Sequence, residues 1–148
     1  TGSLFMSDIV TPGWSPDGEQ FWYTQAHLRN VVEIDGETAL VDNLRLCPQE
    51  TEFDQNLDFA MGGRTHVATA ICFDPAVDEG LLAAVRTVVG EHADADESME
   101  AAITATERPG FVLRAIGKRT EELLALVLAV AGMVRATRGQ GPINLRQY

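Results

Sequence analysis

The residues of this sequence that could support catalysis or bind a metal are few and widely spaced. Glu52, Asp54 and Asp58 lie close together, and His66 follows them. Carboxylate oxygens and imidazole nitrogens are common ligands of divalent cations, so these residues could form a small metal-dependent hydrolytic site. However, the acidic stretch has neither the spacing nor the glycine of an EF-hand loop, and most such stretches are simply solvated.

Signatures of the common enzyme classes are absent from the sequence. There is no nucleophile-elbow, phosphate-loop, dinucleotide-binding or zinc-protease motif. The histidines are isolated from one another, and Cys47 and Cys72 have no metal or redox spacing, so we expect both cysteines to be buried free thiols. The residue types therefore favour a protein that works by binding, without a tightly held cofactor.

Length, charge and hydropathy limit the class of protein further. The chain has 148 residues, enough for one domain, with 45% hydrophobic residues and a net charge of −11. So acidic a chain argues against binding to nucleic acid or to an anionic membrane. The longest apolar run, "LLALVLAVAGMV", is shorter than the roughly 20 residues that span a bilayer, and no secretory signal is visible. We expect a cytoplasmic protein.

The first part of the chain, residues 1–50, is predicted to be β-rich. "SLFMSDIV" is typical of a strand, and "TPGWSPDGEQ" contains turn signals. Asp35-Gly36 lies between two β-rich runs, which predicts a hairpin with a two-residue type I′ loop. Pairing outward from this loop places Arg29 opposite Asp42 and puts Glu33 and Asp42 on one face, where carboxylates could touch a passing cation.

The second part, residues 64–148, is predicted to follow the order β-α-β-β-α, which makes the single domain an α+β protein. "HVATAICFD" is typical of a strand, and a helix follows with Asp74 as its cap and Pro75 in its first turn. Two short strands flank Pro109-Gly110, and "KRTEELLALVLAVAGMVRATRG" predicts a long helix that stops at Gly139.

The last helix and the tail behind it both indicate docking. The helix is apolar on nearly every side, so it is either the spine of the core or in contact with a partner. The tail "PINLRQY" alternates apolar and polar residues, namely Ile143, Asn144, Leu145, Arg146 and Tyr148. If the strand "SLFMSDIV" is left uncovered at a sheet edge, it is a template for self-association.

The middle of the chain resembles the urease accessory proteins of the UreD (UreH) family. The resemblance rests on Pro12-Gly13-Trp14, Gly18-Glu19, Arg29, Glu33-Ile34, Asp35-Gly36, Leu44, Leu46 and Pro48, and on the ending "INLR.Y". Trp14 stands where arginine is common in the family. Family members are about twice as long, so the chain is similar to their C-terminal half alone.

This resemblance implies a non-enzymatic scaffold that assembles the nickel centre of urease. Its partners would be the urease apoprotein and the accessory proteins UreF and UreG, with the C-terminal tail as the expected contact. Nickel would be in transit and not tightly bound, with Glu33 and Asp42 as the expected contacts. The alternative left open by the residues is the hydrolase built on His66 and the acidic stretch.

Overall fold

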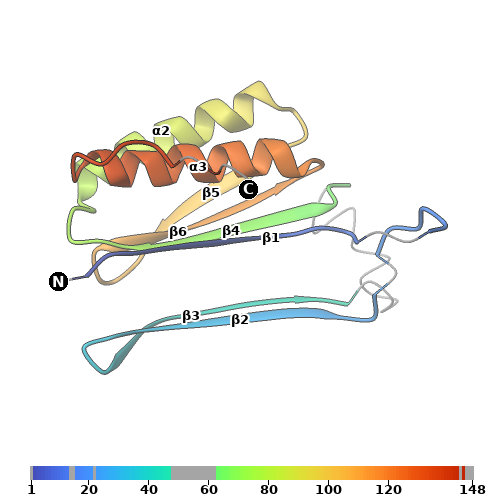
Figure 1. Ribbon diagram of the computed structural model, residues 1–148, viewed down its shortest axis with the longest axis horizontal. Helices are drawn as coiled ribbons and strands as arrows, with labels where there is room; N and C mark the ends of the chain where they lie inside the picture. The colour runs from blue at the N-terminus through green and yellow to red at the C-terminus, as the bar shows by residue number, and fades with distance from the viewer. Residues whose placement is uncertain (1, 14–15, 22, 48–62, 144, 146–148) are drawn as a thin grey trace. The chain divides into compact units, whose positions relative to one another are not determined.

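The computed structural model describes residues 2–13, 16–21, 23–47, 63–143 and 145. These residues form two compact units, one made of residues 1–10 and 66–148 and the other of residues 11–65. The elements, in chain order, are β1 (Leu4–Val10), β2 (Ala26–Ile34), β3 (Glu37–Leu46), β4 (His66–Phe73), α2 (Glu79–Ala95), β5 (Glu100–Ala105), β6 (Gly110–Gly117) and α3 (Thr120–Ala136) (Figure 1). We describe each unit by itself.

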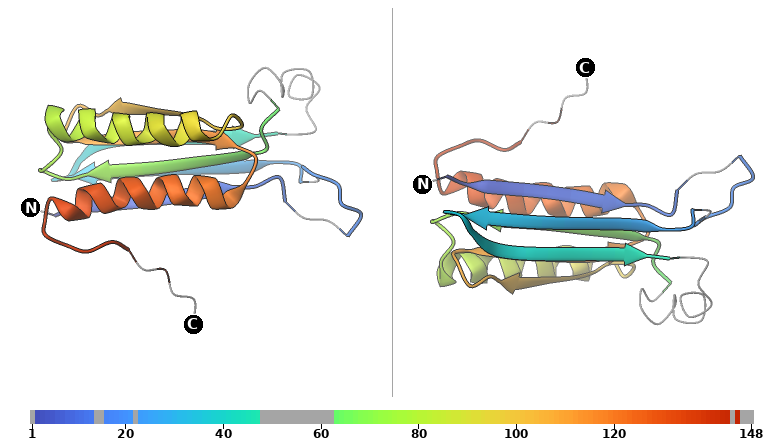
Figure 2. Two further views of the ribbon diagram at one scale, coloured as in Figure 1. Left: turned by 90° about the horizontal axis from the view of Figure 1, so that it is seen from above. Right: turned by 90° about the horizontal axis from the view of Figure 1, so that it is seen from below.

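The larger unit is a four-stranded antiparallel sheet with α2 and α3 side by side on one face (Figures 1 and 2). Its strand order is β1-β4-β6-β5, so β4 and β6 are central and β1 and β5 lie at the edges. This arrangement confirms the predicted α+β class and the predicted order β4-α2-β5-β6-α3. The strand "SLFMSDIV", which the sequence grouped with the β-rich part, pairs instead with β4 of the second part.

The core of this unit lies between the sheet and the two helices. Strand β4 is buried along almost its whole length, as expected for a central strand with an almost continuous apolar run. Its small residues Ala68 and Ala70 face the helices, and larger side chains fill the space between the layers. The larger core residues include Phe111, Leu113, Val85, Val89, Leu123, Leu126, Val127 and Val130.

Helix α2 begins later than the sequence predicted. Asp78 caps it by accepting a 2.8 Å hydrogen bond from the Leu81 N–H, and the helix starts at Glu79. The prediction that Asp74 caps this helix is wrong. The Asp74 carboxylate accepts a 2.8 Å hydrogen bond from the Ala76 N–H and so closes the turn that precedes the helix. The helix continues to Ala95.

Helix α3 packs one face against the core and carries further apolar residues on its partly exposed face. Leu126 and Val130 are fully buried, whereas Leu124 and Leu128 are partly exposed. The helix ends at Ala136, and a turn with Gly139 at φ 68° follows. The prediction that the helix stops near Gly139 is therefore correct, although the helix itself ends three residues before that glycine.

The smaller unit contains the β2–β3 hairpin. Asp35 and Gly36 have φ of 53° and 80°, as a type I′ loop requires, so this prediction is confirmed. The register, however, shifts between Val32 and Glu33 because an irregularity in β3 inserts one residue. The predicted pair of Arg29 with Asp42 is therefore wrong.

Glycine at position 110 is required by the close approach of β6 to β4. A Cβ atom there would collide with the Cys72 carbonyl oxygen and with the Phe73 ring. We expect Gly110→Ala to lower the free energy of unfolding by about 1–3 kcal/mol. Gly90 lies in a helix, and a Cβ atom there would meet no neighbouring atom, so Gly90→Ala should raise the free energy of unfolding by about 0.5–1 kcal/mol. Urea unfolding followed by circular dichroism checks both, and a Gly110→Ala variant as stable as the parent would contradict the close approach.

Candidate functional site

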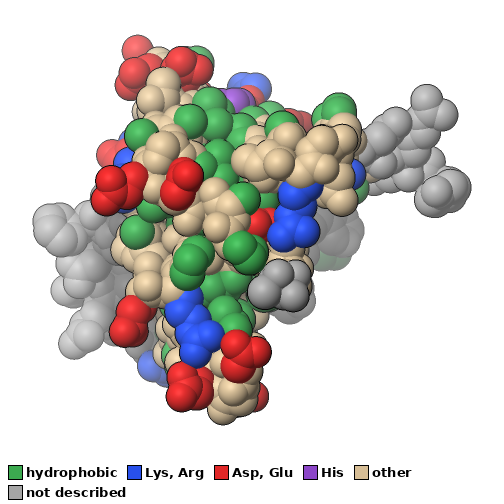
Figure 3. All heavy atoms as spheres, turned by 90° about the vertical axis from the view of Figure 1, so that its left-hand side faces the viewer, with side chains coloured by type: hydrophobic (Ala, Val, Ile, Leu, Met, Phe, Trp, Pro, Cys, Tyr) green, Lys and Arg blue, Asp and Glu red, His purple; other side chains and the backbone are tan. Residues whose placement is uncertain are grey.

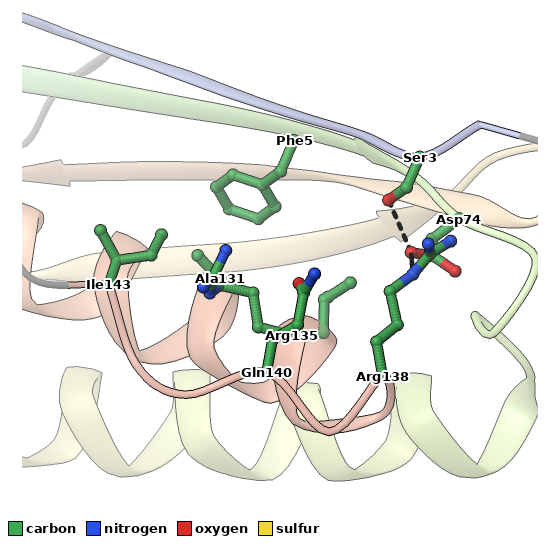
Figure 4. A pocket seen from close by; sticks show the side chains of 9 residues that line it. Ser3, Phe5, Asp74, Ala131, Arg135, Arg138, Gln140 and Ile143 are labelled. Atoms are coloured by element: carbon green, nitrogen blue, oxygen red, sulfur yellow. Dashed lines mark hydrogen bonds and ion pairs between the residues drawn. The ribbon is translucent and has the colours of Figure 1, made fainter.

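A buried carboxylate joins three separate segments of the larger unit. Asp74 follows β4, and its side chain is only 1% exposed. One of its oxygens accepts hydrogen bonds from the Ser3 hydroxyl at 2.6 Å and from the Arg138 Nε at 2.9 Å. The other accepts the Ala76 N–H. Asp74 therefore connects the residue before β1, the end of β4 and the turn after α3 (Figure 4).

The hydrogen bonds around Asp74 keep it ionised. Burial alone would raise the pKa of this carboxyl group, because a charge in a poorly solvated site is unfavourable. The hydrogen bonds from Arg138, Ser3 and Ala76, with the positive charge of Arg138, outweigh burial and lower the pKa. Asp74 is thus a structural anion whose charge is already neutralised, and it is not available as a general acid at neutral pH.

A cavity of about 350 Å³ adjoins this cluster, between β1 and the end of α3. Its apolar wall is made by Phe5, Ala131, Val134 and Ile143. Ser3, Asp74, Arg135, Arg138 and Gln140 supply the polar part of the lining (Figure 4). The combination of an aromatic ring, aliphatic side chains and two arginines suits a side chain of another polypeptide better than it suits a reacting substrate.

The beginning of the C-terminal tail forms one wall of the cavity. The Arg135 Nε donates a 2.8 Å hydrogen bond to the Gly141 carbonyl, and the Gln140 N–H donates to the Arg135 carbonyl at 3.0 Å. These bonds fold the tail back beside α3, and Ile143 reaches the cavity. Leu145 is 59% exposed. Asn144, Arg146 and Tyr148, which the sequence also predicted to make contacts, lie outside the described residues.

The end of the larger unit where β1 begins carries side chains of several kinds. Figure 3 shows basic, acidic and hydrophobic side chains interspersed there. Arg135 lies in the last turn of α3, where a positive charge complements the partial negative charge of the helix terminus. Arg135 therefore stabilises the helix end as well as lining the cavity.

The predicted metal contacts are not brought together. Asp42 lies opposite Asn30, so it shares a face with Val32, whereas Glu33 points to the other face of the hairpin. The shared face assumed from the sequence is wrong, because the irregularity in β3 reverses the alternation at that point. Among the described residues, no group of three or more His, Cys, Asp or Glu could hold a metal ion.

The remaining chemically interesting residues are also placed by the structure. His66 begins β4, and burial lowers its pKa, although the nearby Glu121 charge opposes this. The acids Glu52, Asp54 and Asp58 lie outside the described residues. Both cysteines are free and buried, as predicted. Burial, aided by the Asp74 charge, raises the pKa of Cys72 to about 12, so its thiol is unreactive at neutral pH.

A second hollow lies at the opposite end of the helices, between the loop after α2 and the start of α3. Its lining includes Lys118 and Arg119 together with Asp96 and Glu122. Arg119 pairs with Glu122 at 3.4 Å, and Asp96 accepts hydrogen bonds from the backbone N–H and hydroxyl of Ser98. The Arg119–Glu122 pair and the bonds from Ser98 thus occupy part of the charged lining of this hollow.

Sequence reasoning missed the Asp74 cluster. Arg138 is 64 residues from Asp74, and Ser3 is 71 residues away, so no local spacing links them. The available signal was an aspartate placed directly after a buried strand, which predicts a hydrogen-bonded carboxylate in need of a cation. That signal does not identify which arginine supplies the charge.

The fold and the cavity together define an α+β module in which two helices cover one face of a four-stranded sheet and a cavity lies beside the edge strand β1. Comparison with known families gives a more specific result. The model of the UreD urease accessory protein family matches residues 1–147. The chain therefore belongs to the UreD family.

Individual relatives agree with this assignment. The chain is similar to proteins named urease accessory protein UreD from Paenarthrobacter aurescens (38% identity over 100% of this chain and 52% of the relative) and Actinomyces naeslundii (36%, 99% and 52%). A third, from Corynebacterium glutamicum, is 33% identical over 100% of this chain and 53% of the relative. The chain thus spans about half the length of the curated relatives it matches.

Loss of the Asp74 charge should destabilise the protein in a pH-dependent way. Because the folded pKa is lowered, the stabilisation is fully present above the unfolded pKa of about 3.9 and is lost as the pH falls through the folded value. At pH 7, Asp74→Asn should lower the free energy of unfolding by about 2–3 kcal/mol, because it weakens a charged hydrogen bond to Arg138. Urea titrations at pH 7 and at progressively lower pH measure this difference.

The matched control for this prediction is Asp94→Asn, because the Asp94 side chain is exposed on α2. We expect this control to change stability little. Two results would contradict the structural role of the Asp74 charge. One is an equal loss of unfolding free energy in the two variants, and the other is a loss in Asp74→Asn that stays the same when the pH is lowered below about 4.

Cys72 should resist thiol reagents while the protein is folded. Its side chain is fully buried and its pKa is about 12, so almost no thiolate is present near pH 8. In a Cys47→Ser background, labelling with a maleimide should be negligible in the native state and complete in urea. If one maleimide per chain reacted rapidly with Cys72 in the native protein, the core between the sheet and the helices would be accessible to solvent, contrary to this prediction.

Proposed function

We propose that this chain is a non-enzymatic scaffold in the assembly of the nickel metallocentre of urease. The observation that carries the proposal is the match of the UreD family model to residues 1–147. The relatives named urease accessory protein UreD support it across the whole of this chain. The chain is about half as long as those relatives. That it performs the function of a whole UreD protein is therefore itself part of the proposal.

The proposed partners are the urease apoprotein and accessory proteins of the UreF and UreG types, in the cytoplasm. A docking role is supported by the edge cavity beside Phe5 and by the exposed Leu145 that follows Ile143. Among the described helices, none is long and apolar enough to cross a membrane.

Nickel, on this proposal, is cargo. Glu33 and Asp42 remain the predicted contacts, but each would meet the ion separately, because they lie on different faces of the hairpin. Carboxylates also bind nickel less well than nitrogen ligands do, which favours transit over retention.

The alternative hydrolase finds no support. His66 begins the central strand β4, opposite Gly117 of β6, and the acids that would complete such a site lie outside the described residues. The chain's membership of an accessory-protein family also points away from an enzyme.

Co-purification tests the scaffold proposal directly. The tagged chain should retain urease apoprotein or a UreF-type protein, and the double variant Ile143→Asp, Leu145→Asp should reduce the amount retained at least fivefold, since it places charge on apolar contacts. The double variant Ala83→Asp, Ala84→Asp is the matched control, because it adds the same two charges at exposed positions of α2.

Calorimetry with nickel completes this test. We expect binding weaker than micromolar for the chain alone. Failure to retain either partner, combined with stoichiometric sub-micromolar nickel binding, would contradict the scaffold proposal and favour a metal-holding protein.

A further inference from the structure

Strand β1 is an edge strand without the features that usually protect an edge. It pairs with β4 on one side and with no other described strand. Its seven residues, "LFMSDIV", contain no proline, glycine or lysine, and Asp8 is the only charged residue among them. Native edge strands are commonly interrupted by such residues because an unprotected edge accepts another strand.

One side of β1 opens onto the cavity described above. Phe5, Ser7 and Ile9 lie on the helix side of the sheet, because their β4 partners are the core residues Cys72, Ala70 and Ala68. Phe5 lines the cavity, and Ser7, in the middle of the strand, is exposed. Figure 2 shows β1 at the margin of the sheet, next to α3. A strand added here would therefore place alternate side chains beside the cavity.

We propose that the occupant of this edge is a second copy of the chain, with the two β1 strands paired antiparallel about a two-fold axis at Ser7. Such isologous pairing of identical edges is the simplest closed assembly available to a strand of this kind. It would join two four-stranded sheets into one continuous sheet of twice the number of strands.

The sequence of β1 selects this register. With Ser7 opposite its own copy, Phe5 lies opposite Ile9, Met6 opposite Asp8, and Leu4 opposite Val10. The full length of the strand is then paired, and apolar residues lie opposite apolar ones except where Met6 lies opposite Asp8. Moving the axis by one residue to Asp8 would place two carboxylates directly opposite each other, which is destabilising.

The cavity supports the same register. Ile9 of the second copy, opposite Phe5, would lie on the helix side of the sheet and next to the apolar wall formed by Ala131 and Val134. The tail residue Ile143 lines the same cavity, so the tail of each copy lies at the boundary between them. A net charge of −11 on each copy opposes association, and salt should therefore strengthen the dimer.

A pair of charge substitutions at Met6 tests the register. Met6→Asp places two carboxylates opposite each other at two symmetric positions, and we expect it to weaken dimerisation by about tenfold or more. Met6→Lys places a lysine opposite Asp8 at the same two positions and should leave dimerisation unchanged or stronger. Sedimentation equilibrium over a dilution series measures the dissociation constants, and circular dichroism confirms folding.

A cross-link provides a second measurement that does not depend on the stability of those variants. Ser7→Cys should form a disulfide-linked dimer on mild oxidation, because directly opposed residues in paired strands bring their Cα atoms within disulfide reach. Thr104→Cys on the other edge strand, β5, is the matched control and should not cross-link efficiently. The native cysteines are buried and should not interfere.

The proposal is overturned if the chain is a monomer at tens of micromolar in moderate salt, if the two Met6 variants have equal dissociation constants, or if Ser7→Cys cross-links no better than Thr104→Cys. These readouts concern self-association alone. They are therefore distinguishable from a failure of the chain to retain urease or its accessory proteins.

Discussion

The structure of the larger unit depends on the requirement that a buried carboxylate must be neutralised. Asp74 is held at the end of β4 with almost no solvent exposure, and an isolated charge there would cost several kcal/mol. Arg138 and Ser3 meet this requirement from opposite ends of the unit's sequence. One interaction thus fixes where the first strand begins and how the chain leaves α3, the two segments that flank the edge cavity.

This constraint also sets the state of the reactive side chains around Asp74. The Cys72 thiol, two residues before Asp74, is kept protonated by burial and by the neighbouring charge. Arg138 and Arg135 are committed to Asp74 and to the tail backbone. What this end of the larger unit offers is a cavity with one apolar wall, beside a sheet edge. Such a surface agrees with the chain's membership of the UreD family and with the scaffold role that we propose.

Local sequence signals predicted the helices and strands well. The pairing of these elements was predicted poorly, because it depends on contacts between residues far apart in the sequence. The Asp35-Gly36 loop and the order from β4 to α3 follow from turn residues and apolar periodicity, which act over a few residues. The shift at Val32, the pairing of β1 with β4 and the Asp74–Arg138 bond depend on packing between distant segments. The extra residue in β3 was enough to separate Glu33 from Asp42, so a site prediction that rests on strand alternation is only as good as its register.

Native-state hydrogen exchange of the Asp74→Asn variant tests most directly whether this single carboxylate organises the edge. If it does, the amides of β1 and of residues 140–143 should exchange markedly faster than in the parent protein. The amides around Val85 and Val89 in α2 should keep their protection, because those residues pack in the core without the cluster. Unchanged exchange in β1 and in the tail, with Asp74→Asn folded, would contradict the account.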